Sequence, residues 1–163
     1  MSQVDPQLSA ALSAIPQGGK GPHGEHPHVH ALRQVPLFAG LSRRHLHHLA
    51  DIADEREFSA GRTVVQNGSR GDSFYVILDG KAKVTAGYST RALAKIGPGD
   101  FFGELALLDG GPRTASVIAE TWLTTIRIGR TDFRAMIRSE PEVALKVMEE
   151  LARRLREDRS PTQ

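Results

Sequence analysis

The stretch FGELALLDGGPRTASV, residues 102–117, interrupts a region in which apolar and polar residues otherwise alternate. Gly103 lets the backbone approach a ligand closely, and the main-chain N–H groups at the start of Glu104-Leu105-Ala106 are suited to an anion. Arg113 supplies a bidentate fork for a phosphate, whereas Glu104 is an acceptor suited to sugar hydroxyls. The stretch therefore predicts a pocket for a sugar phosphate that carries one negative charge.

Short strands surround this stretch on both sides. Between about residues 56 and 128 the apolar period is two, which is typical of half-buried strands. The predicted strands are residues 63–65, 74–78, 81–85, 92–96, 115–119 and 123–128. Glycine and proline turn signals separate them, and Asp79-Gly80 between two runs predicts a tight hairpin. Many short strands with this punctuation predict a jelly-roll-like antiparallel β-roll.

Helical periodicity appears before and after the predicted roll. Residues 31–52 carry apolar stripes for two small helices, the second of them capped by Ser42. After the roll, one helix has an apolar side made of Phe133, Met136 and Ile137. A second helix begins at Pro141 and runs to about Asp158. The predicted class is α+β, an antiparallel β-roll flanked by N-terminal helices and a C-terminal helix pair.

The composition is that of one soluble domain with its own core. The chain has 163 residues, 39% of them hydrophobic, and a length near this buries roughly two thirds of the unfolded surface. The lack of cysteine excludes disulfides, thiolate zinc sites and cysteine nucleophiles. No apolar run approaches the roughly 18 residues that span a bilayer, and no secretory leader opens the chain, so we expect a cytoplasmic protein without a membrane partner. The net charge of +2 and the scattered arginines do not favour a nucleic-acid partner.

Residues 1–30 are rich in Gly, Pro, Gln, Ser and His and predict a flexible tail, which leaves residues 31–163 as the folded domain. The tail contains His23, His26, His28 and His30. These histidines raise the alternative of a cupin-type metal enzyme. Cupins place such residues on a barrel strand, however, whereas His28-Val29-His30 precedes the roll. We therefore predict no metal site, no catalytic residues and no cofactor.

Two stretches resemble the signatures of the cyclic nucleotide-binding domain family, the sensor domain of catabolite activators, protein kinase A regulatory subunits and cyclic nucleotide-gated channels. The first signature matches at Phe102, Gly103, Glu104, Ala106, Leu107, Arg113, Thr114, Ala115 and Val117. The second matches at Val64, Val65, Gly68, Gly71, Phe74, Tyr75, Val76, Ile77 and Gly80. One departure is Ser69, where the family more often has Glu or Asp. The resemblance extends from residue 35 to about residue 158.

The resemblance implies a role for each matching residue of the pocket. Glu104 is implied to accept from the ribose 2′-hydroxyl, and Arg113 to hold the cyclic phosphate. Gly103 and Ala115 are implied to offer backbone contacts. Asp72 matches an aspartate that, in kinase regulatory subunits, pairs with the phosphate arginine and orients it. The resemblance therefore implies that Asp72 pairs with Arg113 and orients it without contacting the ligand.

The choice of nucleotide is less well defined. Thr114 follows the arginine, where a hydroxyl can bond either the phosphate or a syn guanine, so this residue does not decide between cAMP, the expected ligand, and cGMP, the alternative. Catabolite activators contact adenine through a Thr-Ser pair, and this chain has Asp158 and Arg159 there. The candidates that remain for covering the base are Leu151, Arg154 and Leu155.

The expected mechanism is a population shift driven by the ligand. Phosphate binding draws the short helix inward, and Leu107 repacks against Phe133, Met136 and Ile137, which moves the last helix. No DNA-binding domain follows, so we expect the signal to pass to an effector protein that the sequence does not identify. A homodimer through the last helix, with Ala144, Met148, Leu151 and Leu155 near heptad spacing, is the alternative output. The alternative function is an interaction module with the same roll that binds no nucleotide in the cell.

Overall fold

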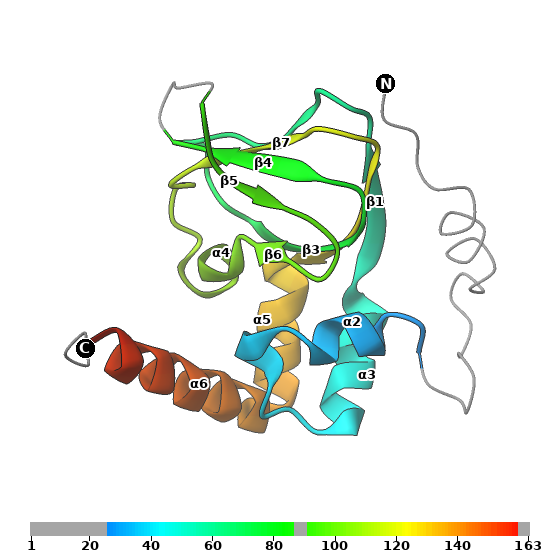
Figure 1. Ribbon diagram of the computed structural model, residues 1–163. Helices are drawn as coiled ribbons and strands as arrows, with labels where there is room; N and C mark the ends of the chain where they lie inside the picture. Colours follow the sequence, from blue (N-terminus) through cyan, green and yellow to red (C-terminus); the bar gives the residue numbers. More distant parts are fainter. Residues whose placement is uncertain (1–25, 87–90, 160–163) are drawn as a thin grey trace.

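A layer of helices supports a roll of two antiparallel sheets (Figure 1). The computed structural model of the protein describes residues 26–86 and 91–159, with the main chain alone at 104–106 and 158–159. The helices before the roll are α2 (Val29–Arg33), the 3-10 helix η2 (Pro36–Phe38) and α3 (Arg43–Ile52). The helices after it are α5 (Arg130–Ser139) and α6 (Pro141–Arg159), whereas α4 (Glu104–Asp109) lies between two strands in the sequence.

Each of the two sheets contains four strands. The first has the order β1 (Asp54–Phe58), β8 (Leu123–Gly129), β3 (Ser73–Asp79) and β6 (Phe101–Phe102). The second has the order β2 (Thr63–Val65), β7 (Ser116–Ala119), β4 (Ala82–Thr85) and β5 (Ala92–Ile96). All pairs are antiparallel, and helices lie on both sequence flanks of the roll. The predicted α+β class and the β-roll are therefore confirmed.

Strand β3 separates two apolar cores. Phe74 and Val76 belong to the core that the first sheet shares with the helices. Tyr75 and Ile77 belong to the second core, which lies inside the roll. Successive side chains of a strand point to opposite faces, so a single strand serves both cores. A residue inside the roll is thus only one strand away from the helical layer.

The turn at Asp79-Gly80 is not the predicted hairpin. β3 pairs with β6 and β8, while β4 pairs with β5 and β7, so the chain passes here from one sheet to the other. Gly80 has a φ of +93°, and a side chain at this position would clash with the carbonyl oxygen of Trp122. The local sequence predicts a turn correctly. The pairing of the two strands depends instead on partners that are distant in sequence.

Aromatic side chains fill the core between the helices and the first sheet. Phe38, Phe74 and Phe133 are fully buried, and the rings of Phe38 and Phe74 pack edge to face with centroids 5.6 Å apart. Burial of one such side chain contributes about 1.5–3 kcal/mol. Ser42 caps α3 as predicted, because its hydroxyl oxygen accepts from the main-chain N–H of His45 at 3.2 Å. This layer is therefore tightly packed.

Helix α2 begins within the stretch that the sequence assigns to a tail. It starts at Val29, and both Val29 and Leu32 are fully buried. The folded domain thus begins before the predicted boundary at residue 31. A single buried valine among Gly, Pro and His gives no periodicity, which is why the pattern missed it. Residues 1–25 of the predicted tail lie outside the described residues.

Helix α6 packs against η2 and α5. Val143 and Val147 are buried on its inner side, whereas Leu145, Met148 and Leu155 are each more than half exposed. At 100° per residue, Met148 and Leu155 point away from these valines. Of the helices in the described part of the chain, none is long and apolar enough to cross a membrane.

Candidate functional site

Arg113 lies between α4 and β7, and its guanidinium is half-buried. Its Nη2 donates to the carbonyl oxygen of Ser73 at 2.7 Å. Its Nη1 is buried and has no hydrogen-bond partner among the described residues. Burial lowers the pKa of Arg113, and nearby Tyr75 and Asp72 oppose that change. One nitrogen of the guanidinium, Nη2, is therefore held in place, while a second donor, Nη1, remains available for a ligand.

Gly103 makes room for this cation. Its φ is +86°, a backbone conformation that favours glycine. A Cβ atom at this position would lie 2.7 Å from the Ser73 carbonyl oxygen and closer still to Nη1 of Arg113. Any side chain here would displace the guanidinium. The glycine that the sequence analysis assigned to a close ligand approach thus also packs directly over the arginine.

The loop between β2 and β3 holds the backbone of the arginine. Gly68 donates its N–H to the carbonyl of Arg113 at 2.8 Å, and Arg113 donates its own N–H to the carbonyl of Ser69 at 2.8 Å. The side chain of Asn67 donates to the carbonyl of Thr114 at 3.0 Å. Ser69 therefore contributes through its main chain, which explains why its departure from the family pattern leaves this loop intact. The sequence analysis did not predict this contact of Asn67.

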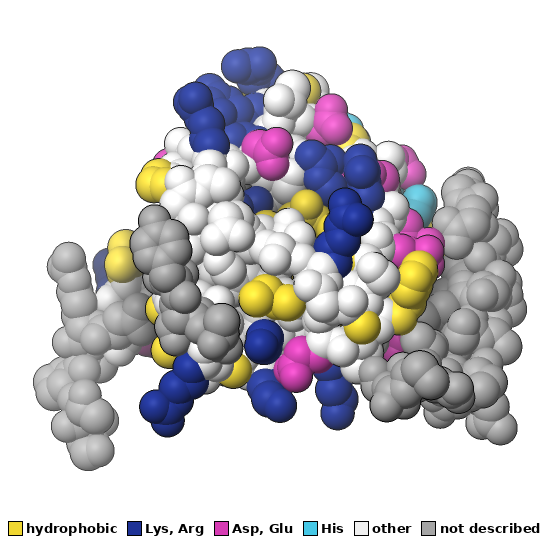
Figure 2. Space-filling model, turned by 90° about the horizontal axis from the view of Figure 1, so that it is seen from above, with side chains coloured by type: hydrophobic (Ala, Val, Ile, Leu, Met, Phe, Trp, Pro, Cys, Tyr) yellow, Lys and Arg dark blue, Asp and Glu magenta, His cyan; other side chains and the backbone are white. Residues whose placement is uncertain are grey.

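A cavity of about 410 Å³ opens beside Arg113. Its lining consists of Thr63, Val64, Val65, Gln66, Ser69, Arg70, Asp72, Tyr75 and Arg113. Arg70, Asp72 and Arg113 bring charge to this lining, and the valines and the tyrosine bring apolar surface, the combination that small-molecule sites commonly show. The volume falls within the usual range for such sites, about 300–1,000 Å³. Lys and Arg side chains also gather on the upper side of the roll (Figure 2).

A second, larger hollow of about 480 Å³ shares only Tyr75 with the first. Arg56 and Arg127 line it, but both already contact the carboxylate of Asp54, at 2.6 Å and 3.6 Å. Glu57 adds a further negative charge to the wall. Two of the three arginines that line this hollow are therefore paired with a carboxylate, and the third, Arg62, is exposed, unlike the half-buried Arg113.

Asp72 does not form the expected ion pair with Arg113. Within the described part of the chain its carboxylate accepts instead from the Ser73 hydroxyl at 2.9 Å. The physical reason is that the guanidinium is drawn to the main-chain carbonyl of Ser73, one residue further along the strand. Asp72 still lies close enough for its charge to act on the pKa of Arg113, and it lines the same cavity.

The structure describes the side chains of only some of the remaining predicted pocket residues. Glu104, Leu105 and Ala106 begin helix α4, and their side chains lie outside the described atoms. Thr114 is exposed and Ala115 is half-buried, directly after the arginine. The structure thus places Gly103, the residue before α4, against Arg113 but leaves the contacts of the α4 main chain and of the Glu104 carboxylate as predictions.

The four predicted switch residues share one core. Leu107, Phe133 and Met136 are buried in the core of the helical layer, and Ile137 packs at its edge. Helix α4 also contacts both β3 and α5. A displacement of α4 would therefore press directly on α5, since close-packed interiors transmit strain.

The three predicted base-covering residues do not reach the cavity. Leu151 packs at the edge of the helical core, Arg154 is half-buried and Leu155 is 59% exposed. None of them is among the described residues that line the cavity. All three lie on α6, which packs against η2 and α5 and extends away below the roll (Figure 1).

The family model of the cyclic nucleotide-binding domain matches residues 55–140, just over half of the chain. This chain belongs to the cyclic nucleotide-binding domain family. The match runs from β1 to the end of α5 and includes Gly103 and Arg113, so the family resemblance of the sequence is confirmed. Among the residues that the structure describes, no group of three or more His, Cys, Asp or Glu is arranged to hold a metal.

Relatives of this domain are regulatory proteins. The cAMP-dependent protein kinase regulatory subunit of Aspergillus fumigatus is 38% identical over 106 residues, which cover 65% of this chain and 26% of that protein. The cyclic AMP receptor protein of Thermus thermophilus is 36% identical over 129 residues, which cover 77% of this chain and 60% of that protein. This chain thus matches less than two thirds of either relative.

A solved structure shows the same fold at closer to full coverage. The N-terminal domain of a transcriptional regulator from Streptomyces coelicolor is 34% identical and superposes with a TM-score of 0.75. The superposition covers 82% of this chain and 97% of that one.

Proposed function

We propose that the protein is a non-enzymatic cyclic nucleotide sensor and that its ligand is cAMP. The observation that supports this most directly is the half-buried guanidinium of Arg113, whose Nη1 has no partner among the described residues. A buried donor without a hydrogen bond costs about 1–3 kcal/mol, and a phosphate oxygen in the adjoining cavity would recover that cost. The names of the relatives from A. fumigatus and T. thermophilus, both of which refer to cAMP, point to the same ligand.

The proposed binding mode follows the family. The cyclic phosphate contacts Arg113 and the main-chain N–H groups that begin α4, and Glu104 accepts from the ribose 2′-hydroxyl. Ala115 offers a backbone contact beside the phosphate. Thr114 is exposed, so its hydroxyl is free to serve either purine, and cGMP stays the alternative ligand.

The proposed signal is a movement of the C-terminal helices toward an effector protein in the cytoplasm. Helix α4 contacts α5, and Leu107 lies in the same core as Phe133 and Met136, so a shift of α4 on phosphate binding would displace α5. Helix α6 would then approach the cavity and bring Leu155 and its neighbours over the base. The ligand drives this shift only to the extent that it binds the second arrangement more tightly.

Self-association through α6 is a second proposed output. Leu145, Met148 and Leu155 form an exposed apolar stripe at near-heptad spacing. This set replaces the one proposed from the sequence, because Leu151 packs toward the helical core instead. We expect Met148→Glu to abolish any homodimer that light scattering detects in the wild-type protein.

Nucleotide binding is the decisive experiment. Calorimetry and thermal unfolding with cAMP, cGMP and 5′-AMP would compare the wild type with Arg113→Ala, and Arg134→Ala, an exposed arginine of α5, serves as the matched control. At one hundred times its dissociation constant a ligand adds about 2.7 kcal/mol to stability. We expect cAMP to do so in the wild type and in Arg134→Ala but not in Arg113→Ala. A flat response of the wild type to both cyclic nucleotides would favour the interaction module.

A further inference from the structure

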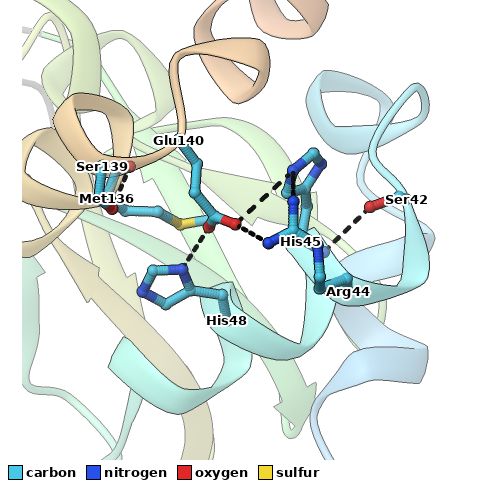
Figure 3. Close-up of polar contacts among 7 residues, drawn as sticks. All are labelled: Ser42, Arg44, His45, His48, Met136, Ser139 and Glu140. Carbon is cyan, nitrogen blue, oxygen red and sulfur yellow. Dashed lines mark hydrogen bonds and ion pairs between the residues drawn. The ribbon is translucent and has the colours of Figure 1, made fainter.

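Glu140 stands at the joint between α5 and α6, and its side chain turns toward α3 (Figure 3). One carboxylate oxygen accepts from Nη1 of Arg44 at 2.6 Å, and the other lies 2.5 Å from Nδ1 of His48. Nε2 of His45 lies 3.8 Å from the first oxygen. The carboxylate side chain is only 13% exposed. We call Arg44, His45, His48 and Glu140 the Glu140 cluster.

The Glu140 cluster connects the joint to a helix far away in the sequence. The partners of Glu140 are more than 90 residues before it, all on α3. Its main-chain N–H donates to Met136 at 2.8 Å, and its carbonyl accepts from Val143 at 3.0 Å. Both α5 and α6 are therefore anchored through this residue. The hydrogen bond from His48 lowers the pKa of Glu140, and the charge of Arg44 does so too, because both favour the ionised carboxylate.

The present position of α6 leaves the nucleotide cavity uncovered. Leu155 is 59% exposed, and the residues that line the cavity all come from β2, β3 and their adjoining loops, except Arg113. To bring Leu155 over the cavity, α6 must swing about its joint with α5. In the proposed signal α4 also displaces α5, and because Glu140 directly follows α5, that displacement would carry it relative to α3 and strain its contacts with Arg44 and His48.

We infer that the Glu140 cluster is a regulatory contact that stabilises the arrangement with α6 away from the cavity and thereby weakens cyclic nucleotide binding. This inference rests on the proposed function. It follows from linkage, because a contact made only in the uncovered arrangement lowers the population of the arrangement that binds the ligand best. Removal of the contact must then tighten binding, whereas a merely structural contact would leave the affinity unchanged or reduce it.

The test compares two charge-neutralising variants of the full chain, each with a control variant that carries the same substitution at a nearby exposed residue. Glu140→Gln keeps the shape of the side chain, and Glu142→Gln, on the exposed first turn of α6, is its control. Arg44→Gln alters a side chain that is 74% exposed and fills no core space, and Arg43→Gln is its control. This second pair keeps the inference testable if Glu140→Gln does not fold.

Calorimetric titration with cAMP is the main measurement. Couplings between sites are typically 5- to 150-fold, so we expect the dissociation constant to fall by about fivefold or more in Glu140→Gln and by a smaller factor in Arg44→Gln. The two controls should match the wild type. An unchanged or weaker affinity in both variants, with normal wild-type binding, would overturn the inference while leaving the proposed function intact.

Hydrogen exchange of α6 without nucleotide gives a second measurement. We expect faster exchange across residues 141–157 in Glu140→Gln than in Glu142→Gln, since the anchor of the joint is lost. Equal exchange in the two variants would count against the cluster as an anchor of α6. If the wild type binds neither cyclic nucleotide, the proposed function fails and the regulatory part of the inference fails with it.

Discussion

Arg113 in the roll and Glu140 at the α5–α6 joint are both charged side chains with much of their surface buried, but they are satisfied to different degrees. Each oxygen of Glu140 has a partner on α3. Arg113 has one anchored nitrogen and one buried nitrogen without a partner among the described residues. A charge whose hydrogen bonds are complete holds the fold together, whereas one with a donor left over retains the capacity to bind a ligand.

The surroundings of the two charges also differ, since Glu140 lies beside a closely packed core and Arg113 beside an open cavity. Glu140 adjoins the helical layer, whose core contains the fully buried rings of Phe38, Phe74 and Phe133. Arg113 adjoins the interior of the roll, where a smaller core leaves a cavity open to one side. The core with the fully buried aromatic rings and the cavity beside Arg113 thus lie in different layers, with β3 between them.

The largest effect should come from the helical core. We expect Phe133→Ala to lower the free energy of unfolding by about 3–5 kcal/mol, because it leaves a large cavity among close-packed rings. Val84→Ala, a half-buried position beside the roll interior, should cost about 1 kcal/mol or less. Urea unfolding of both variants measures the difference. Equal losses would contradict the conclusion that the helical core contributes more to stability than the interior of the roll.

His28 should make the N-terminal part of the helical layer sensitive to acid. Burial lowers its pKa to about 4, with a further contribution from His26, against an ordinary value of 6.5. The unfolded chain therefore takes up the proton first, and stability falls as the pH drops from about 6.5 to about 4. The loss should approach roughly 3 kcal/mol for a side chain that is 15% exposed.

Urea unfolding at several pH values would measure this loss in the wild type and in His28→Gln. The variant should show a flatter dependence between pH 6.5 and 4. His30→Gln, at an exposed position of α2, is the control and should retain the wild-type slope. An identical slope in all three proteins would show that another group accounts for the acid sensitivity.

A substitution at Gly103 should affect the affinity for the ligand beyond its effect on stability. Gly103 and Gly99 both have a φ near +90°, so alanine at either position should cost about 1 kcal/mol through backbone strain. Only at Gly103 does the new Cβ also meet Arg113, since nothing lies within 4 Å of the corresponding point at Gly99. We expect Gly103→Ala to weaken cAMP binding at least tenfold, and Gly99→Ala to leave it unchanged. Calorimetry measures both constants, and equal affinities in the two variants would break the proposed link between this glycine and the arginine.

The smallest effect should come from the charge of Glu140. Its pKa lies below the ordinary value of 4.5, so its carboxylate contributes stability at neutral pH that is lost only as the pH falls through the lowered pKa. Glu140→Gln should therefore lower the unfolding free energy by about 1 kcal/mol at pH 7, a modest amount because Arg44 is largely exposed. The difference from the wild type should shrink as the pH falls below 4.5 and vanish once the pH has passed the lowered pKa. A constant difference over that range would point to lost packing instead of lost charge.

The sequence predicted the local features of the roll better than the contacts between residues that are distant in sequence. The spacing of Gly103 and Arg113 is local, and the glycine punctuation between strands is local as well, so both could be recognised from neighbouring residues alone. The ion pair between Asp72 and Arg113 was predicted but does not form, because a carbonyl one residue away competes for the guanidinium. The part of Asn67 in holding the loop depends on a partner 47 residues away and left no local signal.

The chain by itself determined its secondary structure periods, the roll and the spacing of Gly103 and Arg113, because each of these follows from the chemistry of residues close in sequence. The tertiary structure alone decided that β3 and β4 join different sheets, which side of α6 faces inward, and that Glu140 meets Arg44 and His48. These outcomes depend on the competition among distant surfaces for burial and for hydrogen bonds, and a one-dimensional pattern does not contain that competition.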